Sequence, residues 1–94
     1  MYSLRIEQRV LKLLSNVKTF PAKIHRQITV KIFWLQVEPR PPDSKRIGIG
    51  YRVDSGEYRI FYTVDDEQKI VTVELVGPRN DDEIYKLAER LGLL

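Results

Sequence analysis

The chain has no cysteine, a single histidine and no apolar run close to the roughly 18 residues that a membrane-spanning helix needs. Without cysteine, disulfides, thiolate catalysis and cysteine-ligated zinc are excluded, and one histidine disfavours a histidine-based metal site. We therefore expect neither a metal nor a cofactor. The amino-terminal residues also lack the apolar stretch of a secretion signal, so we expect a cytoplasmic protein without a membrane partner.

Glycine and proline are also sparse, with five of each, whereas 43% of the residues are hydrophobic and 31% are charged. This composition is typical of a folded chain and excludes disorder and low-complexity sequence. The length of 94 residues predicts one domain, spanning residues 1–94, because a second core would leave each half too small to bury much surface.

The net charge of +3 is unevenly distributed along the chain. Residues 1–60 carry 12 Lys and Arg against 5 Asp and Glu, whereas residues 61–94 carry 4 against 8. Clustered cations are typical of a face that binds a polyanion. Composition alone leaves open the alternative that these charges only solvate the surface.

Hydrophobic spacing predicts two helices after a short amino-terminal strand. The first helix has about ten residues and follows the strand over residues 2–7. The second begins at Pro21 and ends before the prolines at 39, 41 and 42. Their apolar stripes are Ile6, Val10, Leu14 and Val17 for the first helix, and Ile24, Ile28, Ile32 and Leu35 for the second.

From Ile47 onward the apolar period becomes two, which predicts three strands joined by hairpin turns. The turns are residues 54–57 and 65–68, and the last strand ends before Gly77. Asn80 and Glu83 have the spacing of a capping box, which predicts a final helix. The order β-α-α-β-β-β-α predicts an α+β fold, with a mostly antiparallel twisted sheet packed against helices.

The turns also predict strand registers. Centring the first turn on Ser55 and Gly56 puts Arg52 directly opposite Arg59, and centring the second on Asp66 and Glu67 pairs Val71 with Tyr62 and Val73 with Ile60. Two opposed arginines destabilise a sheet. Either Glu74 and solvent screen the pair, or the pair binds a phosphate, and geometry leaves both interpretations open.

Between Arg52 and Tyr85 the chain resembles the RelE branch of the RelE/ParE toxin superfamily. The shared marks are YR on one strand, a glycine-containing turn, EYRIFY on the next strand, an acidic turn, an apolar strand ending VG-x-R, and an acidic helix start followed by tyrosine. The resemblance implies a RelE-like, microbial-ribonuclease-like fold. It also implies a metal-independent, ribosome-dependent endoribonuclease that cuts mRNA in the A site through attack of the 2′-OH and so inhibits translation.

The same resemblance implies partners and site residues. The partners are the ribosome, mRNA and a RelB-like antitoxin encoded nearby, which forms a hetero-oligomer with the toxin. Arg59 would brace the phosphate, Arg79 would stabilise the transition state, and Tyr85 would take the 2′-OH proton. The residues expected to contact RNA are Arg52, Lys45 and Arg46, whereas Gly50 occupies a position that is often basic in the family.

Two other functions stay open. A ParE-like inhibitor of DNA gyrase would keep the fold, and a catalytically silent RNA- or protein-binding module is consistent with Gly50. Tyr85 lies beside the apolar stripe of the last helix, so a packing role is also open. Phe33 and Trp34 are expected in the core or in a patch that the antitoxin covers.

Overall fold

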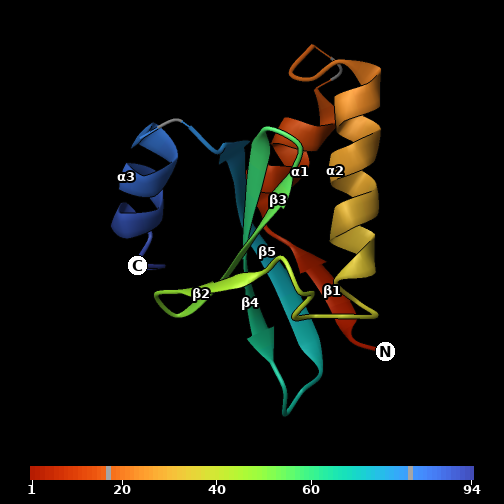
Figure 1. Ribbon diagram of the computed structural model, residues 1–94, viewed down its shortest axis with the longest axis vertical. Helices are drawn as coiled ribbons and strands as arrows, with labels where there is room; N and C mark the ends of the chain where they lie inside the picture. Colours follow the sequence, from red (N-terminus) through yellow and green to blue (C-terminus); the bar gives the residue numbers. More distant parts are fainter. Residues whose placement is uncertain (17, 81) are drawn as a thin grey trace.

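The computed structural model describes residues 1–16, 18–80 and 82–94. Within them, a five-stranded sheet separates two layers of helices (Figure 1). Val17 of the first predicted stripe and Asp81 of the predicted acidic helix start lie outside the described residues. The elements are β1 (Ser3–Ile6), α1 (Gln8–Ser15), α2 (Ala22–Trp34), β2 (Lys45–Ile47), β3 (Gly50–Ser55), β4 (Tyr58–Asp65), β5 (Ile70–Pro78) and α3 (Asp82–Arg90).

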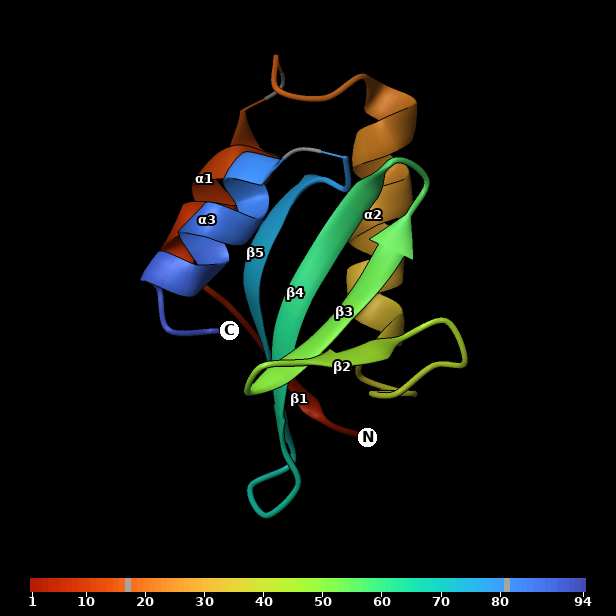
Figure 2. The ribbon, with the colours of Figure 1, turned by 60° about the vertical axis from the view of Figure 1, so that its left-hand side comes forward.

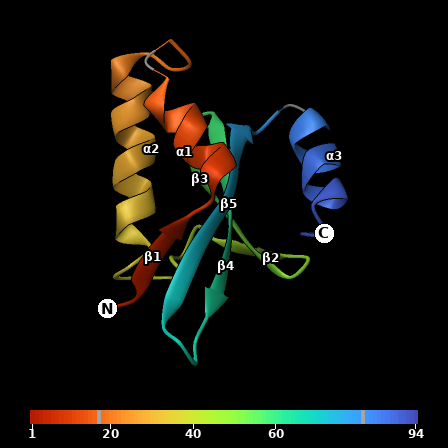
Figure 3. The ribbon, with the colours of Figure 1, turned by 180° about the vertical axis from the view of Figure 1, so that it is seen from behind.

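The α+β class and the mostly antiparallel sheet are confirmed. The strand order is β1-β5-β4-β3-β2, and every neighbouring pair is antiparallel except β1 and β5, which run parallel (Figure 3). The predicted first strand of the carboxyl-terminal half is in fact two strands, because Gly48, with φ of 54°, turns the chain between β2 and β3. The observed order is therefore β-α-α-β-β-β-β-α.

Helices α1 and α2 cover one face of the sheet (Figure 1). The α2 stripe is buried as predicted, because Ile28, Ile32 and Leu35 are at most 1% exposed. These side chains pack with alternate residues of the strands, since successive side chains of a strand point to opposite faces. The strand residues of this cluster are Val53, Ile60, Tyr62, Val71, Val73 and Val76.

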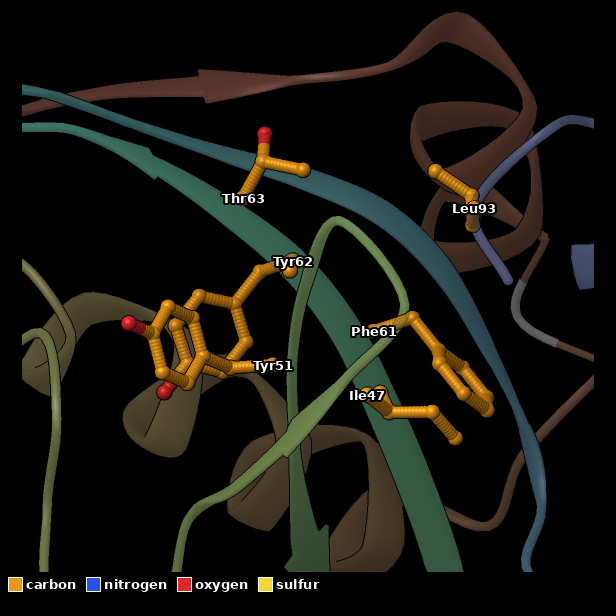
Figure 4. Close-up of a pocket in the computed structure, with 7 residues that line it drawn as sticks. Ile47, Tyr51, Phe61, Tyr62, Thr63 and Leu93 are labelled. Atoms are coloured by element: carbon orange, nitrogen blue, oxygen red, sulfur yellow. The ribbon is translucent and has the colours of Figure 1, made fainter.

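Helix α3 covers the other face, on a smaller cluster that contains Phe61, Leu75, Ile84, Ala88 and Leu93. Figure 4 shows how neighbouring residues of β4 diverge: the Tyr62 ring lies against Tyr51, whereas the Phe61 ring lies beside Ile47. The sheet therefore has a buried hydrophobic cluster on each of its two faces.

The β3–β4 register differs from the prediction. The strands are joined by a two-residue turn at Gly56 and Glu57, and Gly56, with φ of 60°, occupies its first central position. Asp54 is therefore opposite Arg59, whereas Arg52 is opposite Phe61. The prediction of two directly opposed arginines is wrong, because it placed the glycine one position late in the turn.

The β4–β5 register also differs. Tyr62 pairs with Val73, and a β-bulge follows, because Phe61 pairs with Leu75 and leaves Glu74 without a pair. The bulge shifts the alternation, so Val73 faces α1 and α2 whereas Leu75 faces α3. The predicted pairings of Val71 with Tyr62 and of Val73 with Ile60 are both wrong, because Val71 pairs with Val64 and Ile60 with Val76. The face assigned to these residues is right.

Gly50 has a structural reason to carry no charge. It is buried at the start of β3, where a Cβ atom would overlap the carbonyl oxygen of Tyr62. A basic side chain at this position is incompatible with this close approach of β3 to β4.

None of the helices within the described residues has the length and hydrophobicity for a membrane crossing.

We expect Gly50→Ala to lower the free energy of unfolding by roughly 2 kcal/mol or more, because overlap with a strand carbonyl cannot be relieved by a side-chain movement. Ile49→Ala is the matched control, since the Ile49 side chain is 62% exposed and its loss should change stability little. Urea unfolding of both variants measures the difference. Equal stability of the two variants would show that β3 and β4 separate without cost.

Candidate active site

A cluster of charged side chains lies on the α3 face of the sheet, beside the turn that joins β3 to β4. Arg59 on β4 is held by Asp54, its partner on β3. Its Nε donates a hydrogen bond of 2.8 Å to Asp54 Oδ1 and its Nη2 one of 3.3 Å to Oδ2. The Arg59 side chain is only 13% exposed, so this bidentate pair is largely shielded from water.

Helix α3 brings Tyr85 to the same cluster. The third donor group of Arg59, Nη1, donates a hydrogen bond to the Tyr85 hydroxyl. The Tyr85 ring meets the Phe61 ring edge-on, with centroids 5.7 Å apart, and belongs to the rim of the α3 cluster. Tyr85 therefore packs as a stripe-edge residue and also directs its hydroxyl to the charged site.

Arg79 joins the cluster from the segment after β5. Its backbone N–H donates a 2.9 Å hydrogen bond to the carbonyl of Glu57, which ties this segment to the β3–β4 turn. The turn and the carboxyl end of β5 lie at the same end of the sheet (Figure 2). The guanidinium Nη1 of Arg79 lies 3.6 Å from Asp54 Oδ2, and the side chain is 43% exposed. Arg79 is therefore the accessible cation of the site.

Asp54 is the electrostatic centre of this site. Hydrogen bonds from Arg59 lower the pKa of Asp54 below its ordinary value of 3.8, and the charges of Arg59, Arg52 and Arg79 act in the same direction. In turn, the hydrogen bond to Asp54 raises the pKa of Arg59. At neutral pH the site thus holds one carboxylate between two guanidinium groups.

The three residues expected to contact RNA are divided between the two faces. Lys45 pairs with Arg52 across β2 and β3, so both lie on the α3 face with Asp54. Arg46 pairs with Tyr51 and lies on the opposite face. The prediction grouped them because they are close in sequence, but successive residues of a strand alternate.

Arg46 belongs to a second basic cluster around Tyr51. The guanidinium carbons of Arg40 and Arg46 lie 5.2 and 5.3 Å from the centroid of the Tyr51 ring. The Nε of Arg40 also donates a 2.9 Å hydrogen bond to the Tyr51 hydroxyl, which lowers the pKa of that tyrosine. Because Asp66 neutralises Arg40 in a bidentate pair, this cluster presents less net charge than its arginines imply.

Asp54 is the site residue that the sequence-based analysis missed. In one of the two interpretations left open, Glu74 screens Arg59, but Glu74 lies at the bulge and accepts a hydrogen bond from Thr63. Gly56 is the feature of the sequence that could have identified Asp54. If Gly56 is placed in the first position of a two-residue turn, Asp54 pairs with Arg59.

The chemical groups available in this cluster are two guanidinium groups, one carboxylate and one tyrosine hydroxyl. No group of three or more potential metal ligands occurs among residues 1–16, 18–80 and 82–94. Arginines supply charge and hydrogen bonds to phosphate oxygens, and a tyrosine hydroxyl can transfer a proton. The fold and this site together define a small α+β protein whose arginines can bind a phosphate.

The chain belongs to the ParE toxin family, within the RelE/ParE superfamily. A family model described as "ParE toxin of type II toxin-antitoxin system, parDE" matches residues 2–83. The resemblance identified from the sequence is thereby confirmed. A search of curated proteins finds no match.

Solved structures similar to the chain are RelE toxins. An arginine-to-alanine double mutant of E. coli toxin RelE in the free state has a TM-score of 0.73 and 28% identity, with 96% of each chain covered. The isolated E. coli RelE toxin has a TM-score of 0.70 and 27% identity, covering 97% of this chain and 98% of that one. The intact E. coli RelBE toxin–antitoxin complex has a TM-score of 0.69 and 26% identity, covering 86% of this chain and 100% of that one.

The lowered pKa of Asp54 predicts a pH-dependent contribution to stability. The ionised carboxylate stabilises the folded state above the ordinary pKa of 3.8, and this contribution is lost as the pH falls through the lower folded-state pKa. We therefore expect Asp54→Asn to be less stable than the parent near neutral pH, and the difference to shrink below 3.8. Urea unfolding at a series of pH values measures it.

Asp43→Asn is the control, because Asp43 forms an exposed ion pair with Lys31 and should contribute little at any pH. A stability difference for Asp54→Asn that stays constant into the acid range would contradict the prediction.

Proposed function

We propose that this protein is a ribosome-dependent mRNA endonuclease, which cuts mRNA in the A site and is neutralised by a cognate antitoxin. The observation that carries the proposal is that Arg59, Arg79 and Tyr85 converge from β4, from the segment after β5 and from α3. Asp54 contacts both arginines, and Arg59 donates a hydrogen bond to Tyr85. The similarity to E. coli RelE over nearly the whole chain supports it.

The proposed reaction is attack of the ribose 2′-OH on the adjacent phosphate, with departure of the 5′-oxygen. Tyr85, as phenolate, would take the 2′-OH proton, while Arg59 stabilises the tyrosine oxygen through its Nη1 hydrogen bond. Arg79 would stabilise the charge that develops on the phosphate and on the leaving 5′-oxygen, which then takes a proton from water. Its exposure and its loose 3.6 Å pairing with Asp54 leave it able to turn toward a bound phosphate.

Substrate positioning would come from the ribosome and from cations beside the site. Lys45 and Arg52 extend the positive charge along the α3 face, in line with a strand of RNA that crosses β2 and β3. So small a site depends on being presented with mRNA in a reactive geometry, which a programmed ribosome supplies.

A second function, inhibition of DNA gyrase, is favoured by one observation. The matching family model is described as a ParE toxin, not as a RelE toxin. Gyrase inhibition needs no nuclease site, whereas the hydrogen-bonded set of Arg59, Arg79 and Tyr85 has a direct use in RNA cleavage. We therefore rank the nuclease first.

We further propose that the antitoxin covers an apolar patch on α2 and the segment after it. The patch consists of Val30, Phe33, Trp34 and Val37, each at least half exposed. Neighbouring positions of α2 carry exposed basic residues, which suit a partner segment that is apolar at one end and acidic at the other. Complexes of E. coli RelE with its antitoxin are similar to this chain, which supports a protein partner.

For the nuclease, we expect the purified protein to cut mRNA on programmed ribosomes and not to cut naked RNA at a comparable rate.

Arg79→Ala should lower the cleavage rate roughly 30- to 1000-fold with a much smaller effect on ribosome binding, because Arg79 interacts most strongly with the transition state. Arg59→Ala should behave similarly, and Tyr85→Phe separates the hydroxyl from the ring. Single-turnover cleavage and ribosome binding measure the two effects.

The matched control is Arg26→Ala, which removes an exposed arginine from α2 on the other side of the sheet. Its cleavage rate should stay within about threefold of the parent, since its charge lies far from the reacting phosphate. Full toxicity of Arg59→Ala and Arg79→Ala at equal protein level would refute the nuclease. Loss of gyrase supercoiling without loss of translation would establish the second function instead.

For the antitoxin, Phe33→Ala and Trp34→Ala should each weaken binding roughly 10- to 100-fold, because large aromatic residues contribute most at protein interfaces. The cleavage rate should be unchanged, since Phe33 and Trp34 belong to α2, on the face of the sheet opposite the cluster that contains Arg59. Ile49→Ala is the control, because it removes an equally exposed apolar side chain from the β2–β3 turn. Parent-like antitoxin binding by both α2 variants would place the antitoxin elsewhere.

A further inference from the structure

Asp54 has no role in the reaction proposed above, yet it contacts both arginines of the site. Its two carboxylate oxygens accept hydrogen bonds from Nε and Nη2 of Arg59, at 2.8 and 3.3 Å. One of them also lies 3.6 Å from Nη1 of Arg79. The carboxylate thus occupies the place between two guanidinium groups that a phosphate would otherwise take.

This contact fixes the orientation of Arg59. A guanidinium group has two edges that can form bidentate pairs, and Asp54 occupies the edge formed by Nε and Nη2. The group that remains, Nη1, is directed to the Tyr85 hydroxyl. Because Asp54 and Arg59 are direct partners across β3 and β4, the backbone holds both ends of the pair.

The same contact reduces the attraction of the site for an anion. Asp54 offsets one of the two positive charges contributed by Arg59 and Arg79. A phosphate that approaches Arg79 therefore competes with a carboxylate already present. Removing that carboxylate would strengthen phosphate binding in the ground state, where tighter binding does not accelerate the chemical step.

We propose that Asp54 is a positioning residue, which holds Arg59 toward Tyr85 and keeps the ground-state affinity of the site for RNA low. The proposal rests on the nuclease function and deepens it. It predicts opposite changes in two measured quantities when Asp54 is replaced, whereas a merely structural role would weaken both.

The first experiment compares Asp54→Asn with the parent in cleavage on programmed ribosomes and in binding of a short single-stranded RNA. An amide keeps one acceptor but turns an N–H donor toward the other N–H of Arg59, so the orientation is lost. We expect kcat to fall roughly 10- to 100-fold and RNA binding to tighten about 3- to 10-fold. Asp54→Glu keeps the charge one methylene further out and should recover part of kcat.

The second experiment asks whether Asp54 acts through Arg59. In an Arg59→Ala background, the further change Asp54→Asn should lower kcat no more than about twofold, because the group that it positions is already absent. Asp43→Asn is the control for the lost negative charge, since it removes a carboxylate from an exposed pair with Lys31. It should change neither kcat nor RNA binding by more than about twofold.

The third experiment does not depend on activity. In nitrogen-15 spectra of the folded protein, the Nε–H group of Arg59 should exchange slowly with water, and this protection should be lost in Asp54→Asn. The parent could fail to cut mRNA and still show this protection, while Asp54→Asn binds RNA more tightly than the parent. In that case the nuclease function fails, and the positioning of Arg59 by Asp54 stands.

Three outcomes would overturn the proposal. An additive loss of kcat in the Arg59→Ala background would mean that Asp54 acts on the substrate itself, for example as a base. Faster cleavage by Asp54→Asn would mean that the carboxylate only blocks the site. Absence of protection at the Nε–H of Arg59 in the parent would mean that the pair does not persist in solution.

Discussion

The register between β3 and β4 is the constraint on which the site depends. It is set by the two-residue turn at Gly56 and Glu57, where only the first central residue needs positive φ. This turn makes Asp54, not Arg52, the partner of Arg59. In the register predicted from the sequence, Arg52 and Arg59 would be opposed on one face. Asp54, the carboxylate that orients Arg59, would then no longer lie opposite it. The same turn supplies the Glu57 carbonyl that binds the backbone of Arg79.

The site combines fixed and movable cations. Arg59 is 13% exposed and held by the two hydrogen bonds that it donates to one carboxylate, whereas Arg79 is 43% exposed and its guanidinium remains 3.6 Å from the same carboxylate. A fixed cation loses little conformational entropy when a transition state forms, and a movable one can follow the phosphate. For a proposed nuclease with no metal, this division explains how two arginines and one tyrosine would suffice.

The layered fold separates the proposed nuclease site from the proposed antitoxin patch. Arg79 and Tyr85 lie on the side covered by α3, whereas Phe33 and Trp34 belong to α2 on the other side of the sheet (Figure 1). A partner bound to α2 alone would leave Arg79 open to solvent. Neutralisation would then require that the partner also extend around the sheet edge or that its bulk exclude the toxin from the ribosome.

Local patterns in the sequence were sufficient for every element except the division of one predicted strand into β2 and β3, and also for the buried α2 stripe and for the resemblance to the family. The reason is that periodicity and short motifs are properties of neighbouring residues. They were insufficient for register. The position of one glycine within a turn decided which charge faces Arg59. A bulge left Glu74, which one of two open interpretations had screening Arg59, without a strand partner. The resemblance grouped Arg79 and Tyr85 with Arg59, but only the folded chain showed their contacts with the Asp54–Arg59 pair. It also separated Arg46 from Arg52, because such positions depend on how strands alternate and on where a distant helix packs.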